Sequence, residues 1–537
     1  MPILTVKQAG KDRHIIFISG RSVRDILDET DLRVRSGCDG AGACGMCRIR
    51  VVGGHAGEPS VNELANLGAG LLSQSVRLAC QVKAERDLQI EILSRAPRSV
   101  WRSLDQGGAK TCIPATAAAP HPETEHPLGV SVDIGTTHIS ISLLDIHACC
   151  RLAGRLGLNP QSDSGADVLT RLISAQTYEQ GEKLSQQVIQ SIGEGLHDIG
   201  SREGIDLRRV ERVVLVGNTA MLSLLSGQNR HLLLQPRYWS ESIECLPLET
   251  ASWGASWGIS PGAAIDVIPP LAGFVGSDLL SGVLATGLME HGGGALLIDF
   301  GTNSEVALWD GNKIWVTSAA GGPAFEGCGI SCGMPAEPGA IYRVYASDET
   351  GELAFEIVAD AEPRGLCGSG MVDLLACLVR NRTLNKKGQF ASSVQQYGFP
   401  LRRGDLDIVL TKRDIDIFQR AKAAIGVAVN VLLTKAGIGY RELRRICIGG
   451  VFGQYLNIVN AQEIGLLPAI PGLLIETSGN TALSGCETLL LSPEADKRLQ
   501  EVRSRAVLVN LANVAEFESL FLENLYLKPA NENMGHD

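Results

Sequence analysis

Hydrophobic and polar positions alternate over short stretches at the start of the chain and over longer ones after residue 129. The alternation at Ile3–Thr5 and at Ile15–Ser19 predicts short strands near the N-terminus. From Gly129 onward, strand patterns alternate with helical ones, which is typical of an α/β protein. The stretch from Ala96 to Pro127 is rich in Ala, Pro, Thr and His and fits no amphipathic period. We therefore expect a small domain at residues 1–95, a linker at 96–128 and a large α/β domain at 129–537.

The large α/β domain contains an internal repeat. The segment Val132–Asp145 recurs as Ile298–Asp310, and each copy reads as a strand, an Asp-x-Gly-Thr turn and a second alternating strand. Two copies separated by the length of one domain indicate gene duplication into two facing lobes, not a solenoid. Thr411 and Asp414 have the spacing of a capping box, which predicts a long amphipathic helix ending near Gly437.

Composition narrows the class of protein. Of 537 residues, 45% are hydrophobic and 20% charged, which excludes a disordered chain. The net charge of −11 argues against nucleic-acid binding, which needs a basic face. The most apolar stretch, Leu271–Leu288, is broken by Asp278, so we expect no membrane span. The first residues lack a signal-peptide pattern, and we expect a cytoplasmic protein whose clustered thiols serve as metal ligands or redox groups.

Four N-terminal cysteines have a spacing typical of iron–sulfur ligands. Cys38, Cys44 and Cys47 form a Cys-x5-Cys-x2-Cys pattern, and Cys80 follows after 32 intervening residues. Glycines between the first three let the loop wrap inward and expose backbone N–H groups to cluster sulfides. The spacing is that of plant-type ferredoxins with one extra residue in the first gap, and it predicts a [2Fe-2S] cluster held by these four thiolates.

Three other interpretations fit these residues less well. A zinc site usually has two Cys-x2-Cys pairs, whereas the distal half here offers only Cys80. Inert core thiols fit poorly with a loop so rich in glycine. Gly40–Gly45 formally matches the G-x-G-x-x-G dinucleotide motif, but a strand pattern follows it where that motif needs a helix.

The two Asp-x-Gly-Thr turns offer the groups that a nucleotide needs. Each supplies backbone N–H donors and hydroxyls for phosphates, and Asp133 and Asp299 supply carboxylates for a metal ion and water. A third, glycine-rich turn follows a predicted strand at residues 444–448 and enters a helix. No Gly-x4-Gly-Lys-Ser/Thr motif exists, which excludes a P-loop. The candidate nucleotide-binding residues are Gly135, Thr136, Thr137, Gly301, Thr302, Asn303, Gly449, Gly450 and Gly453.

The combination resembles the ATP-dependent reductive activators of corrinoid proteins. The resemblance covers nearly the whole chain and depends on the four cysteines and both Asp-x-Gly-Thr turns, together with the segments Gly217–Met221, Pro269–Gly276, Gly322–Gly327, Ile330–Met334 and Gly449–Gly453. It implies an N-terminal β-grasp, ferredoxin-like α+β domain followed by a duplicated α/β domain of the acetate/sugar kinase, Hsp70 and actin type, with an RNase H-like fold. Longer members carry a small extra domain where this chain has only its linker.

The resemblance also implies a function. A corrinoid protein of a methyltransferase system, oxidised to Co(II), would be returned to Co(I) by one electron from the cluster, with ATP hydrolysis offsetting the uphill step. Asp133 and Asp299 would then bind Mg²⁺ and position the attacking water. The implied partners are the corrinoid protein, an upstream low-potential electron donor and a second copy of the ATPase domain in a homodimer.

Two other functions are compatible with the same residues. One is a small-molecule kinase of the same superfamily, against which the fused cluster argues. The other is an actin-like ATP-binding scaffold whose cluster senses redox state. A kinase assay panel and a test for filaments on ATP addition distinguish them.

Overall fold

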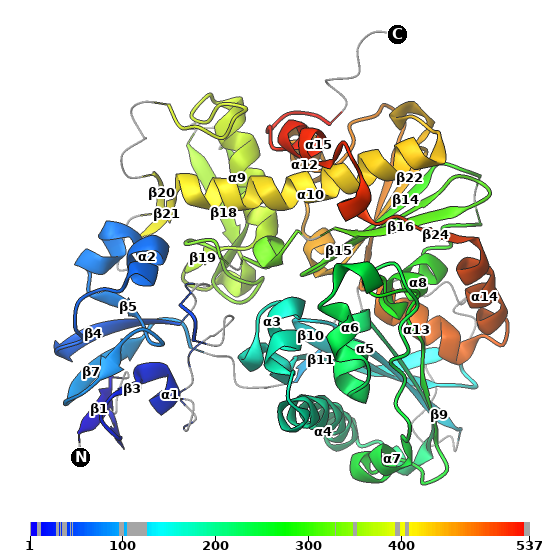
Figure 1. Ribbon diagram of the computed structural model, residues 1–537, viewed down its shortest axis with the longest axis horizontal. Helices are drawn as coiled ribbons and strands as arrows, with labels where there is room; N and C mark the ends of the chain where they lie inside the picture. The colour runs from blue at the N-terminus through cyan, green and yellow to red at the C-terminus, as the bar shows by residue number, and fades with distance from the viewer. Residues whose placement is uncertain are drawn as a thin grey trace.

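A small N-terminal module lies beside a larger body of two lobes in the computed structural model (Figure 1). The structure describes residues 2–7, 12–27, 30, 32, 34, 40–42, 45, 47–95, 101–104, 126–290, 292–319, 321–327, 329–346, 352–391, 398–402 and 407–530.

In its described residues, the N-terminal module is a five-stranded sheet with two helices. Its strand order is β2-β1-β7-β4-β5, in which β1 and β7 are parallel and the other neighbours antiparallel. The elements are β1 (Ile3–Val6), β2 (Arg13–Ile16), α1 (Val23–Leu27), β4 (Arg48–Gly54), α2 (Val61–Ser73), β5 (Val76–Leu78) and β7 (Leu88–Ile92), with a two-stranded ribbon of β3 (Arg21–Ser22) and β6 (Lys83–Ala84). Alternate strand residues such as Leu4, Ile49 and Ile90 are buried in a hydrophobic core that belongs to this module alone.

The first lobe is built on a six-stranded sheet of order β13-β12-β9-β10-β11-β8. Its strands are β8 (Arg102–Ser103), β9 (Leu128–Ile134), β10 (His138–Asp145), β11 (Cys150–Leu158), β12 (Val210–Gly217) and β13 (Ala264–Val267). Its helices are η1 (Pro160–Ser164), α3 (Val168–Ser174), α4 (Tyr178–Glu203), η2 (Leu207–Arg209), α5 (Thr219–Ser226), α6 (Arg230–Leu233), η3 (Pro236–Tyr238) and α7 (Ala251–Trp257).

The second lobe repeats the plan with the sheet order β23-β22-β14-β15-β16-β24. Its strands are β14 (Ala295–Phe300), β15 (Ser304–Trp309), β16 (Ile314–Ala319), β22 (Arg445–Gly449), β23 (Leu474–Gly479) and β24 (Ala506–Leu508). Two small sheets contain β17 (Ala340–Ala346), β18 (Leu353–Ile357), β19 (Gly365–Leu366), β20 (Phe399–Arg402) and β21 (Ile408–Leu410). The helices are η4 (Pro323–Glu326), η5 (Val358–Asp360), α9 (Gly368–Arg380), α10 (Lys412–Ala436), η6 (Tyr440–Glu442), α11 (Val451–Gln454), α12 (Ile458–Glu463), η7 (Leu511–Asn513) and α15 (Phe517–Asn524).

The predicted duplication is visible in the strand pairing. In each lobe the central strand, β9 or β14, forms an antiparallel hairpin with the next strand and a parallel pair with a later one, β12 or β22. The two Asp-x-Gly-Thr turns are the hairpin connections of these central strands. They therefore occupy equivalent places in the two lobes.

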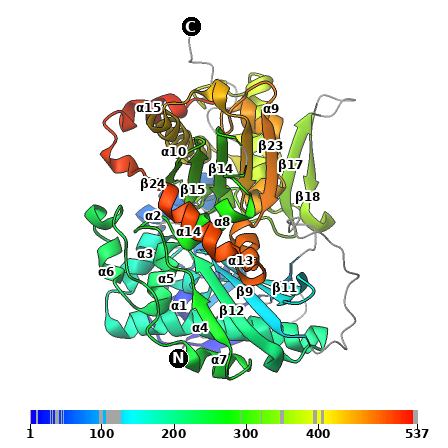
Figure 2. The ribbon, with the colours of Figure 1, turned by 90° about the vertical axis from the view of Figure 1, so that its right-hand side faces the viewer.

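Helices from different parts of the chain pack between the lobes, as Figure 2 shows. They are α8 (Ser277–Ala285), α13 (Thr481–Leu491) and α14 (Ala495–Arg505). The first two cross at Gly485, where an added Cβ would lie 2.0 Å from the carbonyl oxygen of Ser281. Glycine at this position lets the backbones of α8 and α13 approach closely.

The predicted linker at 96–128 needs one correction. Residues 102–103 form β8, which pairs with Arg155 and Leu156 of β11, and Trp101 is buried in the core of the first lobe. An added Cβ on Gly157 or Gly195 would lie 2.8 Å from the Trp101 ring, so these glycines make room for the indole. A lone tryptophan beside a two-residue strand gives no periodic signal, which is why the sequence pattern missed it.

The predicted long helix is present as α10. Thr411 and Asp414 form the capping box, and Gly437 ends the helix in the left-handed conformation. Within the described residues, α10 is the one helix long and apolar enough to cross a bilayer, and 72% of its most apolar stretch is buried inside the protein. That burial is the one expected of a core helix.

Candidate nucleotide and cluster sites

The two Asp-x-Gly-Thr turns face each other across a cavity of about 220 Å³. The Oγ1 atoms of Thr137 and Thr302 lie 3.0 Å apart, so the hairpin of one lobe touches that of the other. Both threonine hydroxyls also donate to the carboxylate of Glu326, at 2.7 Å from Thr137 and 3.3 Å from Thr302. The predicted site residues that line this cavity are Asp133, Gly135, Thr136, Thr137, Asp299, Gly301, Thr302, Asn303 and Gly450.

The first turn is held from behind by Asn159. This buried side chain donates from Nδ2 to the carbonyl oxygen of Gly135 at 2.8 Å, and its backbone N–H donates to the carbonyl of Thr137 at 2.9 Å. An added Cβ on Gly135 would lie 2.7 Å from the carbonyl oxygen of His138, so the turn requires glycine. The turn is thus fixed before any ligand binds.

Three aspartates line the cavity; Asp133 is buried, and Asp278 and Asp299 are half-buried. Burial raises the pKa of Asp133 to about 7, opposed by a hydrogen bond from Asn480 and reinforced by the charge of Asp299. Burial raises the pKa of Asp299 to about 6, against a hydrogen bond from Thr481. Burial, together with the charges of Asp133 and Asp299, raises the pKa of Asp278 to about 7.

Two glutamates add to this group. Burial and the charges of neighbouring aspartates raise the pKa of Glu305, and burial raises that of Glu326. Sequence reasoning missed both as site residues, and it treated Asp278 only as a break in an apolar stretch. Charged residues inside strongly apolar segments were the available signal, since such residues are rarely buried without a partner.

This group of carboxylates fits a divalent cation. In the described part of the chain, no three His, Cys, Asp or Glu side chains form a ready-made cage for a metal ion. Mg²⁺ keeps several waters and binds through one or two carboxylates plus substrate phosphates, so it needs no such cage. A cation here would also relieve the repulsion among the carboxylates.

Asn480 and Thr481 connect the aspartates of the two lobes. Asn480 Nδ2 donates to Asp133 Oδ2 at 2.8 Å, and Thr481 Oγ1 donates to Asp299 Oδ2 at 3.0 Å. Asn480 is also the N-cap of α13. Sequence reasoning missed this pair, although the tetrapeptide Gly-Asn-Thr-Ala occurs both at 479–482 and at 217–220, where Asn218 caps α5 and donates to Thr136.

Of the three glycines predicted in the third turn, only Gly450 lines the cavity. Gly450 has φ 87°, and an added Cβ would lie 2.1 Å from the carbonyl oxygen of Phe300. Gly449 lies behind the cavity, where an added Cβ would be 2.9 Å from Asp299 Cγ. Gly453 does not line the cavity; a Cβ there would be 2.6 Å from Ile448, so this glycine lets α11 pack on β22. Phe452, which does line the cavity, offers a flat surface.

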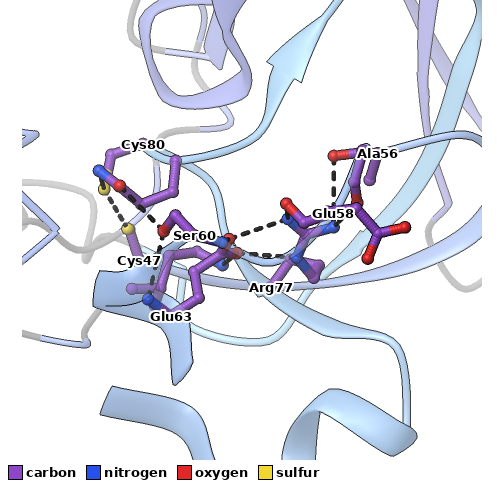
Figure 3. Close-up of polar contacts among 10 residues, drawn as sticks. Cys47, Ala56, Glu58, Ser60, Glu63, Arg77 and Cys80 are labelled. Atoms are coloured by element: carbon purple, nitrogen blue, oxygen red, sulfur yellow. Dashed lines mark hydrogen bonds and ion pairs between the residues drawn. The ribbon is translucent and has the colours of Figure 1, made fainter. Parts of the chain in front are cut away.

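Half of the predicted cluster ligands belong to the described structure. The Sγ atoms of Cys47 and Cys80 lie 3.4 Å apart (Figure 3). Gln81 Nε2 lies 3.6 Å from the Cys80 sulfur. The sulfur–sulfur separation is too long for a disulfide and near the ~3.8 Å between two thiolates on one tetrahedral metal with ~2.3 Å bonds. Cys38 and Cys44 lie outside the described residues. The described pair fits two ligands of one metal atom.

A buried ion pair between Arg77 and Glu63 lies next to the segment that leads to Cys80 (Figure 3). Arg77 donates to both carboxylate oxygens of Glu63 at 2.8 Å, and Glu63 also accepts from the backbone N–H groups of Leu78 and Ser60 at 2.9 Å. Glu63 caps α2 through Ser60. The pair therefore ties α2 to the strand that leads into Cys80.

The fold and both sites define a class of protein in which a ferredoxin module is fused to a two-lobed, ATPase-like body. Family models match three consecutive segments: a 2Fe-2S iron–sulfur cluster binding domain at residues 6–85, the RACo middle region at 128–291, and the C-terminal ASKHA domain of RACo at 294–536. The chain belongs to the family of reductive activators of corrinoid proteins. The predicted family and fold class are thereby confirmed.

Individual relatives agree with this assignment. The corrinoid activation enzyme RamQ of Eubacterium limosum is 31% identical over 431 residues, which cover 75% of this chain and 71% of the relative. A [Co(II) methylated amine-specific corrinoid protein] reductase of Methanosarcina barkeri is 27% identical over 434 residues, which cover 74% of this chain and 76% of the relative. A solved reductive activator for a corrinoid, iron–sulfur protein matches with a TM-score of 0.66 and 26% identity, covering 98% of this chain and 99% of the other.

Proposed function

We propose that this protein reactivates a corrinoid protein of a methyltransferase system by reducing Co(II) to Co(I) with one electron, at the expense of ATP. The observation that carries the proposal is the union, in one chain, of a cysteine-bearing ferredoxin module and a cleft in which two phosphate-type turns meet over buried carboxylates. A kinase or a scaffold would need the cleft but not the module.

Cys38, Cys44, Cys47 and Cys80 are proposed to hold the [2Fe-2S] cluster, which supplies a one-electron couple when bound. The buried Glu63–Arg77 pair fixes the approach of Cys80, and the Gln81 amide lies close enough to its sulfur to donate a hydrogen bond. Hydrogen bonds to cluster sulfurs shift the reduction potential, so Gln81 acts on the thermodynamics of the electron transfer.

The nucleotide is proposed to lie between the two turns. Backbone N–H groups near Gly135 and Gly301, with the hydroxyls of Thr137 and Thr302, are proposed to bind its phosphates, because these four residues line the cavity. The third turn at Gly450, with the Phe452 ring, suits the nucleoside.

Asp133 and Asp299 are proposed to bind Mg²⁺ and to orient the attacking water. Each accepts a hydrogen bond at one carboxylate oxygen from the start of α13, which fixes its orientation and leaves the second oxygen for the cation or the water. The site would then need little reorganisation at the moment of hydrolysis.

ATP is required because the electron transfer is uphill. For a one-electron couple every ~59 mV of unfavourable potential costs a factor of about ten in the equilibrium constant. A nucleotide that binds one conformation more tightly than another can supply this difference. An upstream low-potential donor, a homodimer through the ATPase body and a cytoplasmic location complete the proposal.

The test is an anaerobic assay with a low-potential chemical reductant, a candidate corrinoid protein in the Co(II) state and Mg·ATP, in which Co(I) is followed by its absorbance. We expect Co(I) only with ATP and an intact cluster. Equal Co(I) yields with and without ATP, under a potential at which the step is uphill, would refute the function. Phosphorylation of a small molecule in a kinase panel, or ATP-induced filaments without Co(I), would favour the other two interpretations.

A further inference from the structure

The ferredoxin module contacts both lobes of the ATPase body. Arg413, in the first turn of α10 of the second lobe, donates to the carbonyl oxygen of Ala65 and, at 2.9 Å, to Asn66 Oδ1, both in α2 of the module. Arg24, in α1 of the module, donates from Nη2 to the carbonyl oxygen of Asp163 in the first lobe, at 3.4 Å. Figure 1 shows α10 running from the module across the second lobe.

On the module side, both contacts lead to the cysteine loop. The residue that Arg413 binds, Asn66, donates from Nδ2 to the carbonyl oxygen of Gly42 at 2.8 Å. Arg24 packs against Gly40, where an added Cβ would lie 2.9 Å from its Nη1. Gly40 and Gly42 lie between the predicted ligands Cys38 and Cys44. The side of the module that carries Gly40 and Gly42 therefore faces the ATPase body.

In the first lobe, the contact leads back to the first nucleotide turn. Asp163 belongs to η1, which is capped by Asn159. Asn159 is the residue that binds the carbonyl groups of Gly135 and Thr137. Only three residues separate Asn159, whose side chain holds the turn, from Asp163, whose carbonyl oxygen Arg24 contacts.

In the second lobe, the contact leads to the glutamate that joins the two turns. Asp414, next to Arg413, accepts from Ser331 through both its backbone N–H and its hydroxyl, at 2.5 and 2.6 Å. Ser331 is five residues after Glu326, which binds Thr137 and Thr302. Each lobe thus has a short covalent and hydrogen-bonded connection between its part of the nucleotide site and the module.

We propose that the docked module is the resting state of this activator, and that nucleotide binding between the turns releases the module so that its cluster can reach the corrinoid partner. This inference rests on the proposed function and specifies its regulation. A rigid module bound to two lobes keeps both contacts at one interlobe angle only, and a nucleotide that changes this angle breaks at least one of them.

The docking is weak enough to be reversible. The Arg413 contacts are exposed to solvent, and hydrogen bonds of this kind contribute modestly to stability. Linkage is reciprocal, so a docked module that opposes nucleotide binding weakens nucleotide affinity by the same factor by which the nucleotide weakens docking. Release of the module by nucleotide and the affinity for nucleotide therefore measure the same coupling free energy.

The experiment is hydrogen–deuterium exchange on the full-length, cluster-loaded protein, without any corrinoid protein, with and without a non-hydrolysable ATP analogue and Mg²⁺. We expect the analogue to speed exchange in peptides covering residues 61–73. Arg413→Ala should speed it about fivefold without nucleotide, as expected for loss of one modest interaction, and should bind the analogue more tightly by a similar factor. Lys412→Ala is the matched control, because it removes an ion pair with Asp416 in the same helical turn but no module contact.

Two results would overturn the inference. If residues 61–73 exchange at the wild-type rate in Arg413→Ala, the module is not docked in solution. If their exchange rate does not change when the ATP analogue is bound, docking is not coupled to nucleotide binding. Because exchange is measured without a corrinoid protein, neither result depends on whether Co(I) is formed. Failure of Co(I) formation with a normal exchange response would instead count against the proposed function.

Discussion

Arg77→Met tests how strongly the ferredoxin module depends on its buried ion pair. The Arg77 guanidinium makes two hydrogen bonds to Glu63 and donates to the carbonyl oxygens of Ala56, Gly57 and Glu58 at 3.2, 2.8 and 3.2 Å. The Glu63 side chain is 0% exposed and that of Arg77 is 8% exposed. Methionine matches the aliphatic length of the side chain but leaves Glu63 as an uncompensated buried charge.

The expected loss is about 3–5 kcal/mol, because removal of one member of a buried pair exposes the full desolvation cost of the other. A loss of this size is a large part of the ~5–15 kcal/mol that stabilises a typical domain. Because about 1.4 kcal/mol corresponds to a tenfold change in an equilibrium constant, this loss raises the unfolded-to-folded ratio of the module by a factor of roughly 10² to 4 × 10³. The control is Arg50→Met, whose ion pair with Glu91 at 3.2 Å is partly exposed and should contribute at most about 1 kcal/mol.

The pH dependence has a definite sign. Burial raises the pKa of Glu63, but hydrogen bonds from Arg77 and from the backbone N–H groups of Ser60 and Leu78 outweigh it, so the pKa lies below its usual value of 4.5. The ionised form thus stabilises the wild-type module above the unfolded pKa, and this stability is lost as pH falls through the folded pKa. In Arg77→Met the pKa of Glu63 rises, so the difference from wild type narrows as the pH is lowered from about 8 toward 5.5.

The assay is anaerobic urea unfolding of the cluster-loaded protein, followed by the visible absorbance of the cluster, at several pH values. Equal unfolding free energies for Arg77→Met and wild type at neutral pH would refute the reasoning. If Arg77→Met loses no more unfolding free energy than Arg50→Met, the reasoning is refuted as well, since the buried ion pair would then behave like an exposed one. Absorbance from the cluster separates module unfolding from unfolding of the ATPase body.

The remaining predictions concern both sites. Cys44→Ala should abolish bound iron and sulfide and the EPR signal of the reduced protein. The variant should keep the rise in melting temperature with ATP, because the module has a hydrophobic core of its own. Zinc in anaerobically purified wild-type protein would contradict the cluster assignment. Asp299→Asn should keep that rise but lose about 10²-fold or more in ATP turnover, and unchanged turnover would remove Asp299 from catalysis. Asn480→Ala and Asn480→Asp should both lower ATP turnover about tenfold, because neither new side chain can donate the hydrogen bond that the Asn480 amide donates to Asp133. Normal ATP turnover in either variant would show that this hydrogen bond is dispensable.

Features encoded by neighbouring residues could be predicted from the sequence. The Asp-x-Gly-Thr turns are hairpins because each lies between two alternating strands, and α10 begins and ends at residues whose side-chain chemistry requires it. The duplication was predictable because equivalent turns occupy equivalent positions in the strand pattern. From this, the meeting of Asp133 and Asp299 in one cavity followed.

Features that depend on tertiary packing were not predictable. Asn480 and Thr481 reach the aspartates only because α13 packs against α8 between the lobes, more than 180 residues after Asp299. Asp278 and Glu305 enter the site from a helix and a strand whose other residues are apolar or small, so the hydrophobic pattern alone indicates core positions for both elements. Trp101 joined the first lobe through two glycines that are distant in sequence.

The buried carboxylates explain why a nucleotide could drive a change in the body as a whole. Asp133 belongs to one lobe and Asp299 to the other, and their charges raise the pKa values of neighbouring carboxyl groups in the cavity. This repulsion acts between the lobes, so it opposes their approach, and a divalent cation carried in with the phosphates reverses its sign. We therefore propose that binding of the cation by Asp133 and Asp299 changes the interlobe angle. Because the ferredoxin module contacts both lobes, that angle is the quantity through which hydrolysis at one site can govern the position of the cluster at the other.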